Sequence, residues 1–488
     1  MLRTPPPQTF PPETLSLDEL VPKNHLVRQV DAAIDFEFIR ELVAPLYCHN
    51  NGRPAIDPVR LIKMMLLGYL FGIPSERRLV QEIQVNVAYR WFLRLGLTEK
   101  VPDASTLSQN RRCRFNHSEV FQQIFDNIVE QAIARGLLGG RILYTDSTHL
   151  KASANPHKSK SEQRAVPPGA YFDALNNAVN EDRAAAGKKG LKPALKERQR
   201  KTKVSTPDPD SGFMHRTNKP RGFFYLDHRT VDGQVGIITD TYATPGNVHD
   251  SQPFIERLKR QLSRFCLSPL AVGLDAGYFT APVCYLTEQL GVMPIIGYRR
   301  PNKGPNVFQK KHFTYDRQQD CYVCPQGEKL IYKTTGREGY RHYQAAADIC
   351  QSCPKRGSCT QAKGGKTLTR HVWEDSKEQA RENRLTEWGK KTYKRRKETI
   401  ERSFADAKQH HGHRYARFRG LLKVQIQCLL AATAQNIKKI ALLVAMLCCF
   451  YLWRTSRVNA AGAKITPCRA IKPDNRINEE NGWYAPSS

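Results

Sequence analysis

The segment from residue 222 to 298 constrains the fold of this chain more than any other, because strand-like and helix-like runs follow one another there in order. Two apolar runs, GFFYLDHRTVD and QVGIITDTYAT, are separated around Asp232 and Gly233, which predicts a β-hairpin. SQPFIERLKRQL then predicts a helix, LAVGLDAGY a strand, APVCYLTEQLG a helix and VMPIIGY a strand. A hairpin followed by alternating strands and helices predicts an α/β fold with a mixed sheet covered by helices.

The segments before residue 222 differ from it in composition. Residues 1 to about 135 predict an all-helical domain, because apolar positions recur at three- and four-residue intervals and Asp57 and Ser75 precede helix starts. The strand RILYTD then belongs to a core that runs from 136 to 298. Residues 155–220 of that core are polar and basic, which predicts an insertion or mobile arm that touches DNA and has no core of its own.

Three further segments follow residue 298. Residues 299–385 contain five cysteines and predict a small inserted module. Residues 386–455 return to the core with a basic helix. Their apolar run Ile440–Trp453 has 14 residues, fewer than the roughly 20 that a membrane span needs, and predicts a buried helix. Residues 456–488 are polar and are expected to be a disordered tail.

The net charge of +30 at pH 7, from 76 Lys and Arg against 46 Asp and Glu, is typical of a protein that binds a polyanion. The excess is spread over most of the chain, which favours nucleic acid over a membrane surface. Solubility alone is the alternative, but it does not need so large a charge. The first residues are proline-rich and lack the apolar stretch of a signal peptide, so we expect a cytoplasmic protein with no membrane role.

Two aspartates follow apolar runs that predict strands. Asp146 ends the run ILYT and Asp275 ends AVGL, so both are expected at carboxyl ends of strands, where open sheets place ligand sites. Carboxylates there can hold Mg²⁺, which prefers hard oxygen ligands. Taken alone, a strand-end aspartate is more often a turn former or a helix cap.

A third acid comes from the basic segment YKRRKETIERSFADAKQHHGHRYARFRG. Glu401 and Lys408 lie seven residues apart, two turns on one helical face, so a metal ligand and a phosphate contact can share that face. The alternative is a solvated basic helix laced with ion pairs. Three histidines are expected at the DNA-facing end of this helix: His410, His411 and His413.

The ordered set LYTDSTHLKA, TPGNVHDS, VGLDAGY and ERSFADAKQHHGHRYARFRGL resembles the DDE transposases of bacterial insertion sequences, the group with a Y-R-E-K signature around the last acid. The runs GRPAIDPVRLIKMMLLGYLFGIPSERRL and VPDASTLSQNRRCRF resemble the helical domain that precedes this catalytic core. The resemblance covers most of residues 15–450. It implies an RNase H-like core in which Asp146, Asp275 and Glu401 form a catalytic triad that holds Mg²⁺ or Mn²⁺.

The resemblance also implies which residues grip DNA. Lys408 matches the signature lysine, which would hold a phosphate of the element's end. The arginine position falls on Lys397, with Arg396 one residue early, and the tyrosine position falls on Lys394, with Tyr393 one residue early. The residues expected to contact DNA around this signature are Lys408, Arg396, Lys397 and Arg402. The polar and basic face of DASTLSQNRRCRF adds Arg111 and Arg112, with an ordinary solvated helix as the alternative.

The motif TPGNVHDS supplies two more candidates, His249 and Asp250. Both match a motif of the relatives that the chain resembles. They are expected either as second-sphere groups behind the metal ligands or as a loop cap.

The Cys-rich module carries two CxxC pairs, which indicate a tetrahedral zinc site. A structural Zn²⁺ would organise a segment too small to fold on apolar burial alone, with free thiols and an iron–sulfur cluster as alternatives. The fifth cysteine leaves the ligand set open. The relatives that the chain resembles usually keep counterparts of Cys324, Cys350, Cys353 and Cys359, which implies that these four bind zinc and that Cys321 is the alternate.

These features together predict an enzyme that binds the ends of its mobile element, as double-stranded DNA, and performs metal-dependent cleavage and strand transfer. The alternative is a transposase-derived DNA-binding protein that has lost its chemistry. Two ends must be brought together, so a homodimer is expected. The expected location is the cytoplasm of a bacterium, at the nucleoid.

Overall fold

The computed structural model describes residues 14–48, 55–116, 118–166, 171–192, 198–215, 221–298 and 307–460. The chain divides into two compact units, Met1–Ala441 and Leu442–Ser488, and every sheet belongs to the first. Of the predicted disordered tail, residues 456–460 continue the last helix, and the rest lie outside the described residues.

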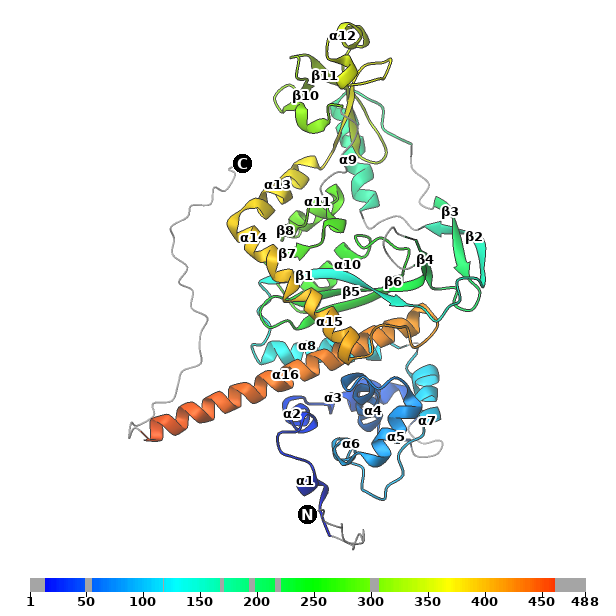
Figure 1. The fold of residues 1–488 in the computed structure, drawn as a ribbon, viewed down its shortest axis with the longest axis vertical. Helices are drawn as coiled ribbons and strands as arrows, with labels where there is room; N and C mark the ends of the chain where they lie inside the picture. The colour runs from blue at the N-terminus through cyan, green and yellow to red at the C-terminus, as the bar shows by residue number, and fades with distance from the viewer. Residues whose placement is uncertain are drawn as a thin grey trace, which may run out of the picture. The chain divides into compact units, whose positions relative to one another are not determined.

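The N-terminal part of the chain is helical, as predicted (Figure 1). Asp57 caps α4 by accepting a hydrogen bond from the Val59 N–H, and Ser75 caps α5 by accepting one from the Arg78 N–H. Helix α4 is buried on nearly all sides and is the centre of this block. The helices are α1 (Leu17–Leu20), α2 (Leu26–Ala33), α3 (Phe38–Val43), α4 (Pro58–Leu70), α5 (Glu76–Val85), α6 (Val87–Phe92), α7 (Ala104–Gln109) and α8 (Val120–Ala134), with a 3₁₀ turn at Ala44–Leu46 and a π turn at Asn110–Arg114.

The main sheet is mixed, as predicted, and its strands follow the order β4-β5-β1-β7-β8. β1 pairs antiparallel with β5 and parallel with β7, and β7 pairs parallel with β8. β6 pairs antiparallel with β5, which confirms the predicted hairpin. The strands are β1 (Ile142–Lys151), β4 (Gly212–Met214), β5 (Gly222–Asp232), β6 (Ile238–Pro245), β7 (Ala271–Leu274) and β8 (Met293–Ile296).

Helices cover both faces of this sheet (Figure 1). Side chains alternate along β1, so Leu143 packs in one layer and Leu150 in the other. Ala380 of α13 belongs to the first layer and Cys428 of α16 to the second. The helices are α10 (Phe254–Arg264), α11 (Ala281–Gln289), α13 (Glu374–Leu385), α14 (Glu387–Lys394), α15 (Ile400–His410) and α16 (Leu421–Ala460), with 3₁₀ turns at Ala276–Tyr278 and Arg395–Lys397.

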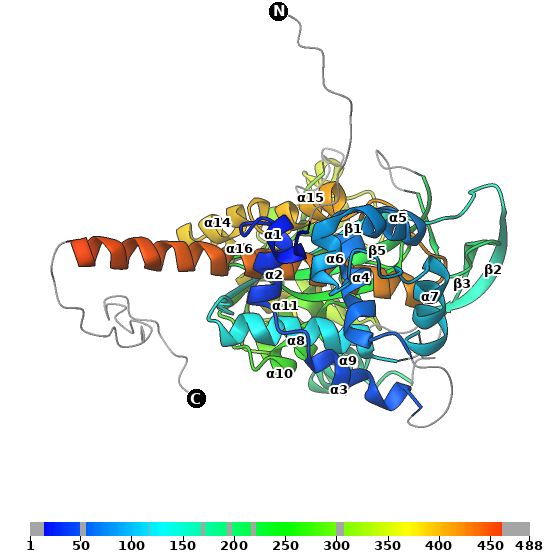
Figure 2. The same cartoon turned by 90° about the horizontal axis from the view of Figure 1, so that it is seen from below.

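The basic stretch 155–220 has more structure than its composition predicts. It forms the two-stranded antiparallel sheet of β2 (Ser159–Val166) and β3 (Arg198–Ser205), seen apart from the main sheet in Figure 2, and the helix α9 (Phe172–Ala185). In α9, Leu175 and Val179 are buried in a cluster with Trp373. The expectation of a stretch without a core is wrong for α9, because its apolar partners come from segments far along the chain.

The cysteine-bearing region folds around a second, five-stranded antiparallel sheet of order β13-β12-β11-β10-β9. Tyr322, Leu330 and Tyr343 are buried in its small core. Helix α13 packs on β8 and α11 and so belongs to the core. The module therefore ends before α13 begins at Glu374, earlier than the boundary at residue 385 that the sequence predicts. The elements are β9 (Thr314–Asp316), β10 (Cys321–Val323), β11 (Lys329–Thr335), β12 (Tyr340–Gln344), β13 (Thr367–His371) and α12 (Ala347–Ser352), with 3₁₀ turns at Lys310–His312 and Arg356–Ser358.

The apolar run Ile440–Trp453 is not the buried helix that the sequence predicts. Ile440 and Ala441 are buried, but Met446 and Phe450 are 61% and 59% exposed. In the described chain, one helix, Leu421–Phe450, has the length and the apolar composition to cross a membrane, and most of its apolar window is buried in the protein. Burial of this kind is also typical of the core helix of a soluble protein.

The buried His371 predicts acid sensitivity of the second sheet. Its Nδ1 accepts a hydrogen bond from the Trp373 N–H, and burial lowers the pKa of His371 from 6.5 to about 4. The unfolded chain therefore takes up this proton near pH 6.5 and the folded chain only near pH 4, so stability falls as the pH drops between these values. Between pH 7 and pH 5 the free energy of unfolding should fall by about 2 kcal/mol from this group.

Urea unfolding at both pH values tests this expectation. In His371→Gln the difference between pH 7 and pH 5 should shrink by about 2 kcal/mol, whereas His157→Gln, which changes an exposed histidine, should keep it. An unchanged difference in His371→Gln would show that protonation of His371 does not limit the fold.

Candidate functional site

The register of two parallel strands brings Asp146 and Asp275 together. β1 and β7 pair up to Thr145↔Leu274, where β7 ends, and the two aspartates are the next residues on each chain segment. Asp275 follows its strand as predicted. The expected strand end is wrong for Asp146, because pairing with β5 keeps β1 extended as far as Lys151.

The guanidinium of Arg396 lies between these two carboxylates. Its Nη2 is 2.5 Å from Asp146 Oδ2, and its Nη1 is 3.7 Å from Asp275 Oδ1. Nη1 also donates to the Tyr393 hydroxyl at 3.4 Å. Lys394 and Lys397, the residues that the signature spacing selects, are exposed. Of the two registers that the sequence leaves open, the structure therefore brings the one with Tyr393 and Arg396 to the acids.

Asp146 and Asp275 have different environments. Burial raises the pKa of Asp146 to about 6, although Arg396 and the Ser147 N–H act in the opposite direction. The charges of Asp275 and Asp250 add to the increase. The Asp275 side chain is 49% exposed, against 22% for Asp146. The carboxylates thus repel one another in a partly dry site, which favours a bound cation.

Helix α15 brings Lys408 close to the acids. Burial is the main reason that the pKa of Lys408 is lowered, and the charges of Arg414 and Arg229 lower it further. The charges of Asp227 and Asp146 raise this pKa. Lys408 is therefore within electrostatic range of Asp146, on the side of the sheet that α15 covers. This position suits the predicted contact with a DNA phosphate.

Glu401, the third predicted acid, lies on α15. It is exposed in the first turn of α15, and among the described residues Asp146, Asp275 and Glu401 do not form a group whose ligand atoms all lie within 4.8 Å of one another. It shares a helical face with Lys408, as the seven-residue spacing predicts. The structure thus links Asp146 and Asp275 through Arg396, and Glu401 as the third ligand stays a prediction.

Of the pair His249 and Asp250, one reaches the site. The Ser147 hydroxyl donates to Asp250 Oδ1 at 2.8 Å, while the Ser147 N–H donates to Asp146 Oδ1 at 2.8 Å. His249 is exposed, and its Nδ1 bonds to Ser251. The second-sphere expectation therefore fits Asp250, and the loop-cap alternative fits His249.

The remaining predicted DNA contacts divide in the same way. Arg111 is buried, where it pairs with Glu76 at 3.0 Å and stacks over the Phe418 ring at 3.9 Å. The prediction for Arg111 is wrong. Its side chain looks solvated in the local sequence, but Phe418 and Glu76, which are distant in the sequence, cover it. Arg112, Lys397 and Arg402 are exposed, as a DNA contact requires.

Two family models match the chain. Residues 15–113 match a transposase domain of the DUF772 family, and residues 323–441 match a transposase DDE domain. The second segment contains Arg396, Glu401 and Lys408. These matches place the chain among the DDE transposases. No curated protein matches the chain.

Two solved structures show a distant similarity to this transposase. The piggyBac transposase synaptic complex with hairpin DNA is 10% identical over 91% of this chain and 77% of that one, with a TM-score of 0.32. The Mos1 transposase paired-end complex with left transposon end is 16% identical over 51% of this chain and 61% of that one, with a TM-score of 0.16. Both TM-scores are too low to establish a common fold.

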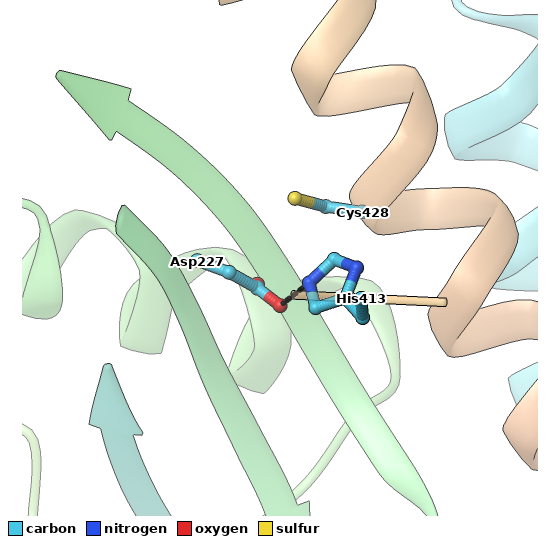
Figure 3. Close-up of side chains that lie close together, drawn as sticks. All are labelled: Asp227, His413 and Cys428. Atoms are coloured by element: carbon cyan, nitrogen blue, oxygen red, sulfur yellow. Dashed lines mark hydrogen bonds and ion pairs between the residues drawn. The ribbon is translucent and has the colours of Figure 1, made fainter. Parts of the chain in front are cut away.

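A fully buried polar cluster lies beside the site of the transposase. It surrounds Asp227, which pairs with Arg229, the residue opposite Asp146 in the β1–β5 ladder. The sequence does not reveal this cluster. The cluster has three members, whose ligand atoms all lie within 4.8 Å of one another (Figure 3). They are Asp227 of β5, Cys428 of α16, and His413, which lies between α15 and α16. Asp227 accepts from Arg229 Nε at 2.7 Å, and its Oδ2 is 2.8 Å from His413 Nε2. Its other oxygen accepts from the Thr241 hydroxyl at 2.7 Å.

The electrostatics of this cluster argue against a metal ion there. Burial raises the pKa of Asp227, but Arg229 and His413 outweigh burial and hold that pKa well below its usual range. Burial also raises the pKa of the Cys428 thiol well above its usual value. The expectation that His413 faces DNA is wrong, and so is that for His411, whose buried Nδ1 bonds to the Tyr69 carbonyl.

Four of the five cysteines of the module gather together. Burial raises the pKa of Cys359, and the charge of Lys366 lowers it. Three other thiols add to the increase: Cys350, Cys324 and Cys353. Cys321 is buried in β10 opposite Ile331. Within the described chain, the thiols do not come as close to one another as the ligand atoms of the Asp227 cluster. The set of zinc ligands stays a prediction.

Replacing Arg396 should change the ionisation of Asp146. Arg396 lowers the pKa of Asp146, so in Arg396→Gln that pKa should rise above about 6, and cation binding should require a higher pH. The pH of half-maximal Mn²⁺ binding, measured by electron paramagnetic resonance, reports this shift. Lys397→Gln is the matched control, because it removes an exposed neighbouring charge. A shift in Lys397→Gln and none in Arg396→Gln would contradict the assignment.

Proposed function

We propose that this transposase binds the ends of its mobile element and cleaves and joins DNA with the help of divalent cations. The observation that carries the proposal is the adjacency of Asp146 and Asp275 at the end of a parallel strand pair, beside the basic side chains of Arg396 and Lys408. An RNase H-like core is part of the proposal. The mixed sheet with helices on both faces is compatible with it.

The residues at the site fit a cation. The guanidinium of Arg396 already places positive charge between the two carboxylates. Asp146, Asp275 and Glu401 would hold Mg²⁺ or Mn²⁺, with Glu401 supplied by the exposed start of α15. A bound metal would activate a water or a 3′-hydroxyl and stabilise the leaving oxygen.

The basic residues have the task of holding DNA. Lys408 would hold a phosphate beside Asp146, and the exposed Arg112, Lys397 and Arg402 would hold the backbone further out. Positioning and charge neutralisation supply most of the rate in phosphoryl transfer. The alternative, a binding protein without chemistry, is not favoured, because the two aspartates are kept side by side.

The assembly and the location of the protein remain part of the proposal. Joining two ends requires that they be held together, so a homodimer on double-stranded DNA is proposed. The bacterial cytoplasm, at the nucleoid, is the proposed location, in agreement with a net charge of +30.

Cleavage of DNA that carries the element's ends tests the function. Wild type with Mg²⁺ should cut this DNA, and Asp146→Asn should lose at least about 100-fold in rate, because the amide is a poor ligand for a hard cation. DNA binding by Asp146→Asn should remain. Equal cleavage by the two proteins would refute the assignment, and binding without cleavage by either would support the binding-protein alternative.

Zinc in the Cys-rich module is proposed from the grouping of its thiols. Cys324, Cys350, Cys353 and Cys359 would complete a tetrahedral site, with Cys321 outside it. Metal analysis of the purified protein should find one Zn²⁺ per chain. Cys353→Ser should lose it, and Cys321→Ser should keep it. Loss in Cys321→Ser with retention in Cys353→Ser would identify the other ligand set.

A further inference from the structure

Asp250 lies in the loop between β6 and α10, and one residue ties it to the catalytic strand. Ser147 donates its backbone N–H to Asp146 and its hydroxyl to Asp250, each at 2.8 Å. Ser147 thus fixes one oxygen of each carboxylate. This is a stronger constraint than a loop cap needs, since the hydroxyl spans 103 positions of the chain.

The second oxygen of Asp250 faces the turn that carries Asp275. Oδ2 lies 3.9 Å from the position that a β-carbon on Gly277 would take. Gly277 stands two residues after Asp275, in the 3₁₀ turn Ala276–Tyr278. Asp250 therefore links two segments of the site. Its Oδ1 is held by Ser147 of β1, and its Oδ2 faces the turn after β7.

A buried hydroxyl close to these carboxylates has no hydrogen-bond partner in the described protein. Tyr278 is 1% exposed, its ring packs edge-on against Phe254, and its hydroxyl is unpaired. Asp146, Asp250 and Asp275 are the acids that act on this hydroxyl. Buried hydroxyls are nearly always paired in folded proteins, so an unpaired one among three carboxylates indicates a position where a ligand is held.

A second buried polar atom without a partner among the described residues belongs to the strand beside Ser147. His228 stands opposite Ser147 in the β1–β5 ladder and is 5% exposed. Its Nε2 bonds to the Thr244 hydroxyl, while its Nδ1 has no partner. Asp250 is the acid that acts most strongly on His228. Asp250 thus acts on two buried polar groups that each have an unpaired atom, which makes this a built site and not merely a cluster of acids.

We propose that Asp250 and the Tyr278 hydroxyl hold the water ligands of the cation bound by Asp146 and Asp275, with Ser147 holding Asp250 in place. The inference rests on the proposed function. Mg²⁺ keeps several waters in its shell, and each water needs an acceptor or a donor in the protein. Asp250 acts through such a water, so it is a positioning residue.

Mn²⁺ binding to the full chain without DNA tests this role directly. Asp250→Asn keeps the shape of the side chain and removes its charge, and it should weaken Mn²⁺ binding about tenfold, as expected for a group that orients metal ligands. Tyr278→Phe keeps the ring packing and should weaken binding by less. Glu256→Gln makes the same chemical change at an exposed acid of α10 and should leave binding unchanged. Circular dichroism shows whether each variant is folded.

The Mg²⁺ dependence of DNA cleavage separates the inference from the proposed function. Asp250→Asn should need about tenfold more Mg²⁺ for half-maximal cleavage, and Asp250→Glu should restore part of the loss. If wild type does not cleave DNA but the Mn²⁺ affinities follow the expected order, the proposed function fails and the inference stands. Wild-type Mn²⁺ affinity in Asp250→Asn, alongside a loss in Asp146→Asn, would overturn the inference.

Discussion

The buried ion pair of Asp227 and Arg229 is the interaction on which the rest of the site depends. The pair lies on the face of the main sheet that carries Asp146 and that α15 and α16 cover. Both side chains are fully buried on β5, two residues apart, and a charge in such a place is tolerated only when it is paired and hydrogen-bonded. Removing one member of a buried pair typically costs about 3–5 kcal/mol, because the other charge is left uncompensated. Arg229 stands opposite Asp146 in the β1–β5 ladder, so this network lies directly beside the site.

The partners of the pair come from β6, from the segment between α15 and α16, and from α16. Thr241 of β6 and His413 bond to Asp227, and Arg229 Nη1 donates to Gln435 of α16 at 2.7 Å. Gln435 in turn donates to the Ser403 carbonyl of α15. A shift of α15 would therefore break hydrogen bonds inside a dry network, which holds the helix and its Lys408 in place.

The sequence predicts the elements of the core well because their signals are local. The hairpin, the alternating strands and helices and the caps at Asp57 and Ser75 each follow from residues close together in the chain. The failures share another cause. Arg111, His413 and α9 look solvated in their own sequence, but are covered by segments far away, such as Phe418 over Arg111. Composition cannot report partners of that kind.

The one-residue ambiguity in the Y-R-E-K register has a similar physical origin. The signature counts residues as if one helix ran through Tyr393, Arg396 and Glu401. The structure instead breaks the helix at the 3₁₀ turn Arg395–Lys397, and Thr399 leaves helical geometry with ψ −90 before α15 begins. The break at Thr399 lies between Arg396 and Glu401, where this chain has one residue more than the signature spacing. The chain leaves helical geometry there, so Arg396 and not Lys397 reaches Asp146, and the site has an arginine where the spacing alone selects a lysine.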